Sequence, residues 1–177
     1  FLLYVNGKSA GMSKCSHNGA EFDITDYAVN GENTLHVAVF TRSDASYLED
    51  QDFFRFNGIF RDVYLLTRPE NHIDDISIKT DNSGALDISV TFRGKKSEYS
   101  CKIYDADGNF ITDKPFIPNV KLWNAEEPNL YTVVFSACGE FIRIRVGFRE
   151  ISWSGGVFKV NGTPVKMKGV NRHDTDA

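Results

Sequence analysis

Cysteine is scarce in this chain, and its few cysteines are not arranged for cross-linking or metal binding. The 177 residues contain three cysteines, Cys15, Cys101 and Cys138, without a CxxC pair or a Cys/His cluster. This odd number and wide spacing argue against a disulfide framework and against a zinc site. We therefore expect free thiols that are buried or neutral, which fits a reducing compartment.

Long apolar runs and concentrated positive charge are also missing. No run approaches the length of a membrane helix. The formal net charge is −4, and the densest basic group, Arg93, Lys95 and Lys96, surrounds Gly94, as in a solvated turn. Without a stripe of Lys and Arg, the sequence offers no surface for nucleic acid. These absences argue against a membrane protein and against a nucleic-acid binder.

The sequence also lacks helical periodicity, and most of its periodic segments have the pattern of strands. Only residues 25–29 suit a single helical turn. In residues 86–92 apolar and polar residues alternate strictly, as in a strand with one face on a core. Strands are predicted over residues 1–5, 33–40, 59–66, 73–79, 85–92, 98–104, 130–137, 141–146 and 158–160. The predicted fold class is therefore all-β.

The chain divides best at Arg68-Pro69-Glu70-Asn71, because proline cannot donate to a sheet ladder and polar residues surround it. From residue 73 to about residue 151, roughly six short strands predict a small antiparallel sandwich. A large aromatic such as Trp123 is expected in its core. At the start, Phe1-Leu2-Leu3-Tyr4 leads into the hairpin turn Asn6-Gly7 and lacks a basic leader region. These first residues look like a strand cut from a larger sheet.

Residues 43–63, SDASYLEDQDFFRFNGIFRDV, form the most unusual stretch of the chain. They hold five acids, four Phe and two Arg, with neither helical nor alternating periodicity. So many large apolar groups predict a loop that folds back and is held by aromatic burial. Ordered loops with acids at fixed points are frequent places for functional sites. Arg55, Arg61 and Asp62 are predicted to fix the shape of this loop through ion pairs and stacking.

Several motifs, in a fixed order, resemble glycoside hydrolase family 2 and, within it, the large bacterial β-galactosidases. The resemblance covers essentially all 177 residues. It rests on Tyr4-Val5-Asn6-Gly7, Ala20-Glu21-Phe22-Asp23-Ile24-Thr25, Ser46-Tyr47-Leu48-Glu49-Asp50-Gln51-Asp52, Asn57-Gly58-Ile59-Phe60-Arg61-Asp62-Val63, Leu122-Trp123 with Pro128-Asn129-Leu130-Tyr131, Gly147-Phe148-Arg149-Glu150, and Gly169 to His173. The long Glu49-Asp50-Gln51-Asp52 loop is similar to galactosidases in particular.

The resemblance implies three parts. Residues 1–67 correspond to the C-terminal part of a jelly-roll sugar-binding domain, whose early strands are missing. Residues 68–151 correspond to an immunoglobulin-like β-sandwich with Trp123, Pro128 and Tyr131 as its core signature. Residues 152–177 correspond to the lead-in to a TIM-barrel catalytic domain. Within them, Gly169 to His173 would begin the first barrel strand and its following loop, on the face where barrel sites form. We expect exposed apolar surface at both ends, and therefore self-association.

The resemblance implies that two residues of this chain bind the substrate. Asp52 matches a family aspartate that reaches the galactosyl hydroxyls and helps ligate a sodium ion, and a carboxylate is a hard oxygen ligand that accepts sugar hydroxyls. His173, in Asn171-Arg172-His173, matches a histidine of the galactose subsite, where neutral imidazole both donates and accepts. Asp174 departs from the glutamate that many relatives have, which puts the exact substrate in doubt.

The resemblance implies a retaining β-galactosidase that hydrolyses terminal β-D-galactosides. It also implies a bacterial, cytoplasmic enzyme. Such an enzyme needs two carboxylates across the scissile bond. The family's two glutamates lie on late barrel strands, outside these residues, so this chain alone is predicted to be inactive. For the complete enzyme the resemblance implies Na⁺, Mg²⁺ and a homo-oligomer. Two alternatives stay open, a non-catalytic carbohydrate-binding or structural module and a β-glucuronidase or mannosidase of the same family.

Overall fold

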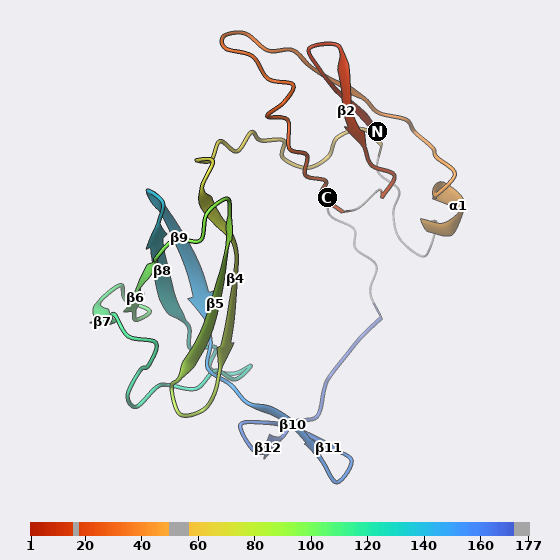
Figure 1. Cartoon of the computed structure of the whole chain (residues 1–177). Coiled ribbons are helices and arrows are strands. Elements are labelled where there is room, and N and C mark those ends of the chain that lie inside the picture. The colour runs from red at the N-terminus through yellow and green to blue at the C-terminus, as the bar shows by residue number, and fades with distance from the viewer. Residues whose placement is uncertain (16–17, 50–56, 172–177) are drawn as a thin grey trace. The chain divides into compact units, whose positions relative to one another are not determined.

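A computed structural model describes residues 1–15, 18–49 and 57–171 of the chain (Figure 1). Twelve strands and one helix of a single turn, α1 (Ser46–Glu49), are found there, which confirms the all-β prediction. The contacts divide the chain into two compact units, Leu66–Lys168 and the remainder, Phe1–Leu65 with Gly169–Ala177. The three parts predicted from the sequence, 1–67, 68–151 and 152–177, stay a prediction.

The first unit contains one three-stranded antiparallel sheet in the order β2-β1-β3. Its strands are β1 (Leu2–Val5), β2 (Lys8–Met12) and β3 (Leu35–Ala38). Asn6 and Gly7 join β1 to β2 with φ of 50° and 77°, the left-handed values of a type I′ turn, as the Asn-Gly pair predicted. The strand β2 was missed, because Lys8-Ser9-Ala10-Gly11 has little β propensity and the turn brings it to β1.

Two local predictions in this unit have opposite outcomes. The single turn predicted over residues 25–29 is confirmed as an isolated hydrogen-bonded turn, since the amide of Ala28 donates to the Ile24 carbonyl at 3.1 Å. The strand predicted over residues 59–66 is wrong, because these residues belong to no ladder among those that the structure describes. Tyr64 is 83% exposed and Leu66 64% exposed. A β-branched and aromatic run forms a strand only when a neighbour completes its hydrogen bonds.

The second unit is a β-sandwich. One layer is the antiparallel pair β4 (His72–Thr80) and β5 (Leu86–Arg93). The other layer is a four-stranded antiparallel sheet in the order β7-β6-β8-β9 (Figure 1). Its strands are β6 (Ser100–Tyr104), β7 (Phe110–Thr112), β8 (Tyr131–Ala137) and β9 (Glu140–Val146). Apart from the three-residue β7, these strands lie where the sequence predicted them.

The core of the sandwich is made by alternate residues of these strands. In β8 the side chains of Tyr131, Val133, Phe135 and Ala137 are buried, and the residues between them are half-buried. This pattern follows from the two-residue period of a strand with one face on the core. The ring of Tyr131 meets the ring of buried Phe148 edge to face, with centroids 5.5 Å apart. The prediction of a small antiparallel sandwich is confirmed.

Trp123 does not lie in this core, which corrects the prediction made for it. The side chain is half-buried, and the guanidinium carbon of Arg149 lies 4.5 Å from the centre of its ring. A large aromatic at the end of a sandwich can serve as a platform for a cation instead of a core filler. Pro128 is exposed, and only Tyr131 of the three signature residues is buried.

A second three-stranded sheet follows the sandwich within the same unit. It consists of β10 (Ile151–Ser154), β11 (Val157–Val160) and β12 (Thr163–Pro164), in that order. The turns Gly155-Gly156 and Asn161-Gly162 both have positive φ at each position, which confirms the hairpin predicted around Asn161-Gly162. We call these three strands the hairpin sheet.

Candidate functional site

The two predicted substrate-binding residues, Asp52 and His173, both lie outside the residues that the structure describes. Arg55 and Asp174 also lie outside them. The roles of these side chains therefore stay predictions. The structure does describe segments that precede them in the chain, which are α1 before Asp52 and the hairpin sheet before His173.

The segment before Asp52 is fixed by short-range contacts. The amide of Ser43 donates to Ser46 Oγ at 2.9 Å, and the amide of Ser46 donates back to the Ser43 carbonyl at 3.1 Å. These reciprocal bonds close the turn that leads into α1. Lys14 Nζ lies 2.8 Å from Asp44 Oδ2, and this hydrogen bond and charge hold the pKa of the Asp44 carboxyl below its ordinary value. The exposed pair ties the start of the loop to the residues that follow β2.

The segment after Asp52 carries the stacking predicted for Arg61. Its guanidinium carbon lies 5.5 Å from the centre of the Phe60 ring, and Phe60 is half-buried. Cation–π contacts of this kind fix a side chain without enclosing it. The other three Phe of the loop, Phe53, Phe54 and Phe56, lie outside the described residues.

The segment before His173 begins at a side-chain clamp that the sequence analysis missed. Asn161 Oδ1 accepts the amide of Glu150 at 2.9 Å, and Asn161 Nδ2 donates to the Trp123 carbonyl at 3.0 Å. The amide of Asn161 also donates to the Glu150 carbonyl at 2.8 Å. We call these three bonds the Asn161 clamp. Asn-Gly indicated only a turn, and nothing in the sequence indicated which groups the Asn side chain reaches.

A half-buried ion pair lies at the predicted division of the chain. Arg68 donates from Nε and Nη2 to the two carboxylate oxygens of Glu140, each at 2.9 Å, and from Nη2 to the Ile73 carbonyl at 2.6 Å. The two side chains are 24% and 17% exposed. The Arg68 hydrogen bonds lower the pKa of the Glu140 carboxyl despite partial burial. This fork holds the residues beside Pro69 on the sandwich.

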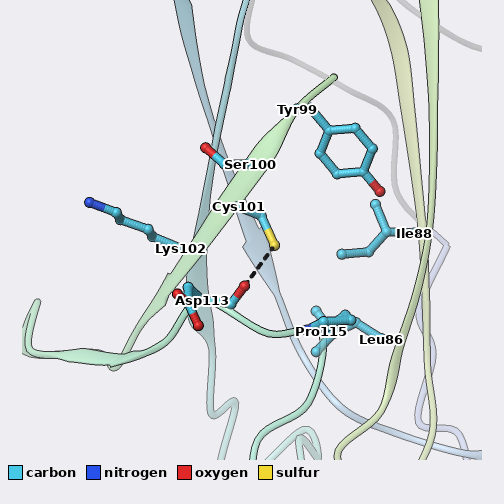
Figure 2. A pocket seen from close by; sticks show the side chains of 8 residues that line it. All are labelled: Leu86, Ile88, Tyr99, Ser100, Cys101, Lys102, Asp113 and Pro115. Carbon is cyan, nitrogen blue, oxygen red and sulfur yellow. Dashed lines mark hydrogen bonds between the residues drawn. The ribbon is translucent and has the colours of Figure 1, made fainter. Parts of the chain in front are cut away.

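An open depression of 630 Å³ lies between β5 and β6 (Figure 2). Its apolar wall is formed by Leu86, Ile88 and Tyr99. The Cys101 thiol points to the Asp113 carbonyl at 4.0 Å, whereas the Lys102 side chain is directed away from it (Figure 2). Burial, with the Asp113 charge, raises the pKa of the Cys101 thiol. The lining offers a neutral thiol and one carboxyl group, so it lacks the carboxylate pair that glycoside hydrolysis needs.

Neither a cluster of metal-ligating side chains nor a membrane-spanning helix is found in the described part of the chain. No three His, Cys, Asp or Glu residues there gather closely enough to hold a metal ion. No helix there is long and apolar enough to cross a membrane. All three cysteines are free, with Cys101 buried, Cys138 half-buried and Cys15 exposed.

Comparison with known proteins assigns both halves of the chain to one family. The model of the sugar binding domain of glycosyl hydrolases family 2 matches residues 1–69. A second model of glycosyl hydrolases family 2 matches residues 71–149. The two matches meet beside Pro69 and together span most of the 177 residues.

Curated relatives match along the whole chain. It is 39% identical to a β-galactosidase of Actinobacillus pleuropneumoniae over 99% of the chain and 18% of the relative. It is 41% identical to a β-galactosidase of Clostridium acetobutylicum over 100% of the chain and 22% of the relative. The chain therefore spans about a fifth of the length of these relatives.

Solved structures share the fold. A β-glucuronidase of Faecalibacterium prausnitzii matches with a TM-score of 0.76 and 24% identity, over 95% of this chain and 35% of that one. A β-glucuronidase of an uncultured Clostridium species matches with a TM-score of 0.76 and 26% identity, over 92% of this chain and 32% of that one. The paired family matches, the similarity along the whole sequence and the shared fold agree, and the chain belongs to glycoside hydrolase family 2.

Proposed function

We propose that this chain is part of a retaining β-galactosidase that hydrolyses terminal β-D-galactosides. The observation that carries the proposal is the 39% and 41% identity, over nearly the whole chain, to relatives named β-galactosidase. Two carboxylates across the scissile bond do the chemistry in such an enzyme. The family's glutamates correspond to residues outside these 177, so the chain by itself is inactive.

The proposed role of Asp52 follows from the chemistry of its carboxylate. An ionised carboxylate is an acceptor only, and it binds sugar hydroxyls through charge-assisted hydrogen bonds. It is also a hard oxygen ligand, suited to Na⁺. One carboxylate cannot enclose an ion, and the described residues supply no complete ligand set. The Na⁺ and Mg²⁺ of the complete enzyme would need further ligands from outside this chain's described part.

His173 is proposed as the second contact to the galactosyl group. Neutral imidazole donates from one ring nitrogen and accepts at the other, so it binds a hydroxyl that does both. Near neutral pH an unperturbed histidine is mostly uncharged. The complete enzyme is further proposed to be a cytoplasmic bacterial homo-oligomer.

A β-glucuronidase is the second candidate, favoured by the solved structures of that name. A glucuronide carries a carboxylate where a galactoside carries a primary hydroxyl group. An anionic Asp52 beside the sugar would repel that carboxylate, because like charges at close range disfavour each other. Asp52 therefore favours the galactoside, and its effect on the two substrates distinguishes the candidates.

The test uses the complete protein that contains these residues, assayed with nitrophenyl β-galactoside and nitrophenyl β-glucuronide. We expect cleavage of the galactoside, and Asp52→Asn should lower kcat/KM by roughly 10–100-fold because it removes a charged hydrogen-bond partner. Asp50→Asn, two residues away in the same loop, is the matched control and should leave activity near wild type.

Three results would contradict the proposal. Preferential cleavage of the glucuronide would favour the second candidate. Unchanged galactoside hydrolysis by Asp52→Asn would remove Asp52 from the site. A reading frame that ends shortly after Ala177 would leave no room for a catalytic domain. The chain would then be a non-catalytic carbohydrate-binding or structural module, to be examined by titration with sugars.

A further inference from the structure

The outer face of the four-stranded sheet in the second unit is positively charged, although the chain carries a net charge of −4. Lys102 of β6 and Arg143 of β9 lie in one row across the sheet, because each is the register partner of Val134 in β8. Arg145 follows Arg143 two positions along β9 and therefore points to the same side. All three cationic side chains are exposed. We call the outer surface that carries Lys102, Arg143 and Arg145 the cationic face.

The cationic face is directed away from the core of the sandwich. In β6 the two neighbours of Lys102, which are Cys101 and Ile103, are both buried. Figure 2 shows the Lys102 side chain leaving the strand on the side opposite to the Cys101 thiol. Successive side chains of a strand point to opposite faces of the sheet, so the cations reach solvent while their neighbours fill the core.

No acidic side chain neutralises these cations within the part of the chain that the structure describes. None of the three forms an ion pair there. On the four strands of this sheet, the residues that share the outer face with them are neutral: Ser100, Tyr104, Phe110, Thr132, Val134, Ser136 and Phe141. On the other sheet, by contrast, Lys79 of β4 lies opposite Asp87 of β5. Like charges on one sheet face repel each other, and an anionic ligand would relieve that repulsion.

The spacing of the cations suits an extended anion. Neighbouring strands are about 4.8 Å apart, so Lys102 and Arg143, two strands apart, are separated by roughly 10 Å at the backbone. Arg143 and Arg145, two residues apart on one strand, are separated by about 7 Å. A polymer with negative charges along its length can contact all three cations at once, which a single small anion does less well.

Peptides and nucleic acids fit this face less well than a charged polysaccharide. The strands β6 and β8 are paired on both sides, so the middle of the face offers no free backbone edge to which a peptide strand could add. A nucleic-acid duplex carries one negative charge per about 1.7 Å of its axis. A chain of net charge −4 repels a polymer of such high charge density.

Two exposed aromatic rings flank the cations. Phe141 is 77% exposed and precedes Arg143 by two positions on β9. Phe110 of β7 is 56% exposed, and its ring meets the Tyr104 ring edge to face with centroids 5.9 Å apart. The negative face of an aromatic ring attracts C–H groups, and sugar rings present such groups on their apolar sides. The rings therefore add contacts that suit a carbohydrate.

We propose that the cationic face binds an acidic polysaccharide, whose sugars carry carboxylates. Lys102, Arg143 and Arg145 contact the carboxylates, and Phe141 and Phe110 contact the sugar rings. Membership of a glycoside hydrolase family favours a carbohydrate over other anionic polymers. The binding site belongs wholly to the second unit, so it depends neither on β-galactosidase activity nor on the proposed substrate-binding residues.

NMR titration of the isotope-labelled 177-residue chain tests the proposal, because it detects weak binding and locates it. The probe is a short oligogalacturonate at low salt, and a neutral galactan oligosaccharide of the same length is the comparison ligand. We expect the oligogalacturonate to shift the amide signals of β6, β8 and β9 around the cationic face. The neutral ligand should leave them nearly unchanged. Added salt should weaken the binding, since it screens exposed charges.

Substitutions that remove one charge each separate this face from the net charge of the chain. Arg143→Gln should weaken binding of the oligogalacturonate about threefold, and Arg143→Gln combined with Arg145→Gln roughly tenfold. Lys79→Gln is the matched control, because it removes one exposed cation from the other sheet and should leave the affinity unchanged. Unchanged signals of core amides in each variant show that the fold is intact.

An absence of shifts on the cationic face would overturn the proposal, and so would equal shifts with the neutral galactan. Equal weakening by Lys79→Gln and Arg143→Gln would show that net charge, not this face, attracts the ligand. Tighter binding of a single-stranded oligothymidylate of the same length would make the face a nucleic-acid surface instead. Whether the complete protein cleaves a galactoside is a separate result, which tests the proposed function alone.

Discussion

The two units of the chain differ in how completely they cover their apolar residues. Among the described residues, Val5 is the only buried hydrophobic residue of the first unit, whereas the second unit buries a continuous cluster around Phe135 and Phe148. The first unit leaves large side chains such as Phe40 and Tyr64 in solvent. Both units place apolar residues in their strands, and the units differ in how far those residues are covered.

The difference shows that a sheet is stabilised by what covers it. The second unit supplies both layers of its sandwich from its own sequence, β4 and β5 against β6 to β9. The first unit supplies one three-stranded sheet in its described part. A sheet face buries its apolar residues only against a second layer. Three predictions sharpen this comparison.

The largest effect is expected in the core of the second unit. Phe135→Ala should lower the free energy of unfolding by about 3–5 kcal/mol, because it removes a fully buried ring and leaves a cavity. The matched control is Phe141→Ala on the neighbouring strand β9, where the ring is 77% exposed, and it should cost less than about 0.5 kcal/mol. Urea unfolding measures both. Equal losses would show that the sandwich is not the stable body of the chain.

A smaller effect is expected from the Arg68–Glu140 pair. Arg68→Ala should cost about 1–2 kcal/mol, because it removes a fork of charged hydrogen bonds from a half-buried carboxylate. The folded-state pKa of Glu140 is lowered, so this stabilisation is complete above about pH 4.3 and is lost as the pH falls through the folded-state pKa. When urea unfolding is measured from pH 7 to pH 3, the free energies of unfolding of the wild type and the variant should become equal at the acidic end.

The first unit provides the control for this pair. Lys14–Asp44 has the same kind of contact, at 2.8 Å, but its side chains are exposed. Lys14→Ala should leave the unfolding curve unchanged, since solvent screens exposed pairs. A pH-independent loss in Arg68→Ala would mean that packing, not charge, accounts for the effect.

The smallest effect on stability is expected in the exposed run of the first unit. Leu65→Ser should change the free energy of unfolding by less than about 0.5 kcal/mol, because the side chain is already in solvent. It should nevertheless reduce self-association, which is driven by exposed apolar surface. Gel filtration over a concentration series measures this. A wild-type chain that elutes as a sharp monomer would contradict the expectation.

Much of the fold was predictable because its signals are local. The alternation in β5 and β8 follows from the two-residue period of a strand. The turns at Asn6-Gly7 and Asn161-Gly162 follow from the tolerance of Asn and Gly for positive φ. The short strands β2 and β7 were missed, since their residues carry no such pattern and pair because a neighbouring strand is present. The strand β10 was missed although its sequence, ISWS, alternates, because a run of four residues is a weak signal.

The candidate site could be predicted from the sequence less completely than the fold. Asp52 and His173 were chosen through a family resemblance, and their roles stay predictions. The contacts that fix the flanking segments, Asn161 with Trp123 and Arg68 with Glu140, join residues 38 and 72 positions apart. No local pattern reveals such partners, because hydrogen-bond geometry depends on where the chain returns.

The sequence by itself determined the all-β class, most strand positions, the hairpin turns and the family, because each depends on residue types at short or fixed spacing. Only the tertiary structure decided that residues 59–66 form no strand in the described part and that Trp123 supports Arg149 instead of filling the core. It also decided that the Asn161 side chain links the hairpin sheet to Trp123. Burial and side-chain hydrogen bonds depend on what other parts of the chain bring alongside, and that information is not local.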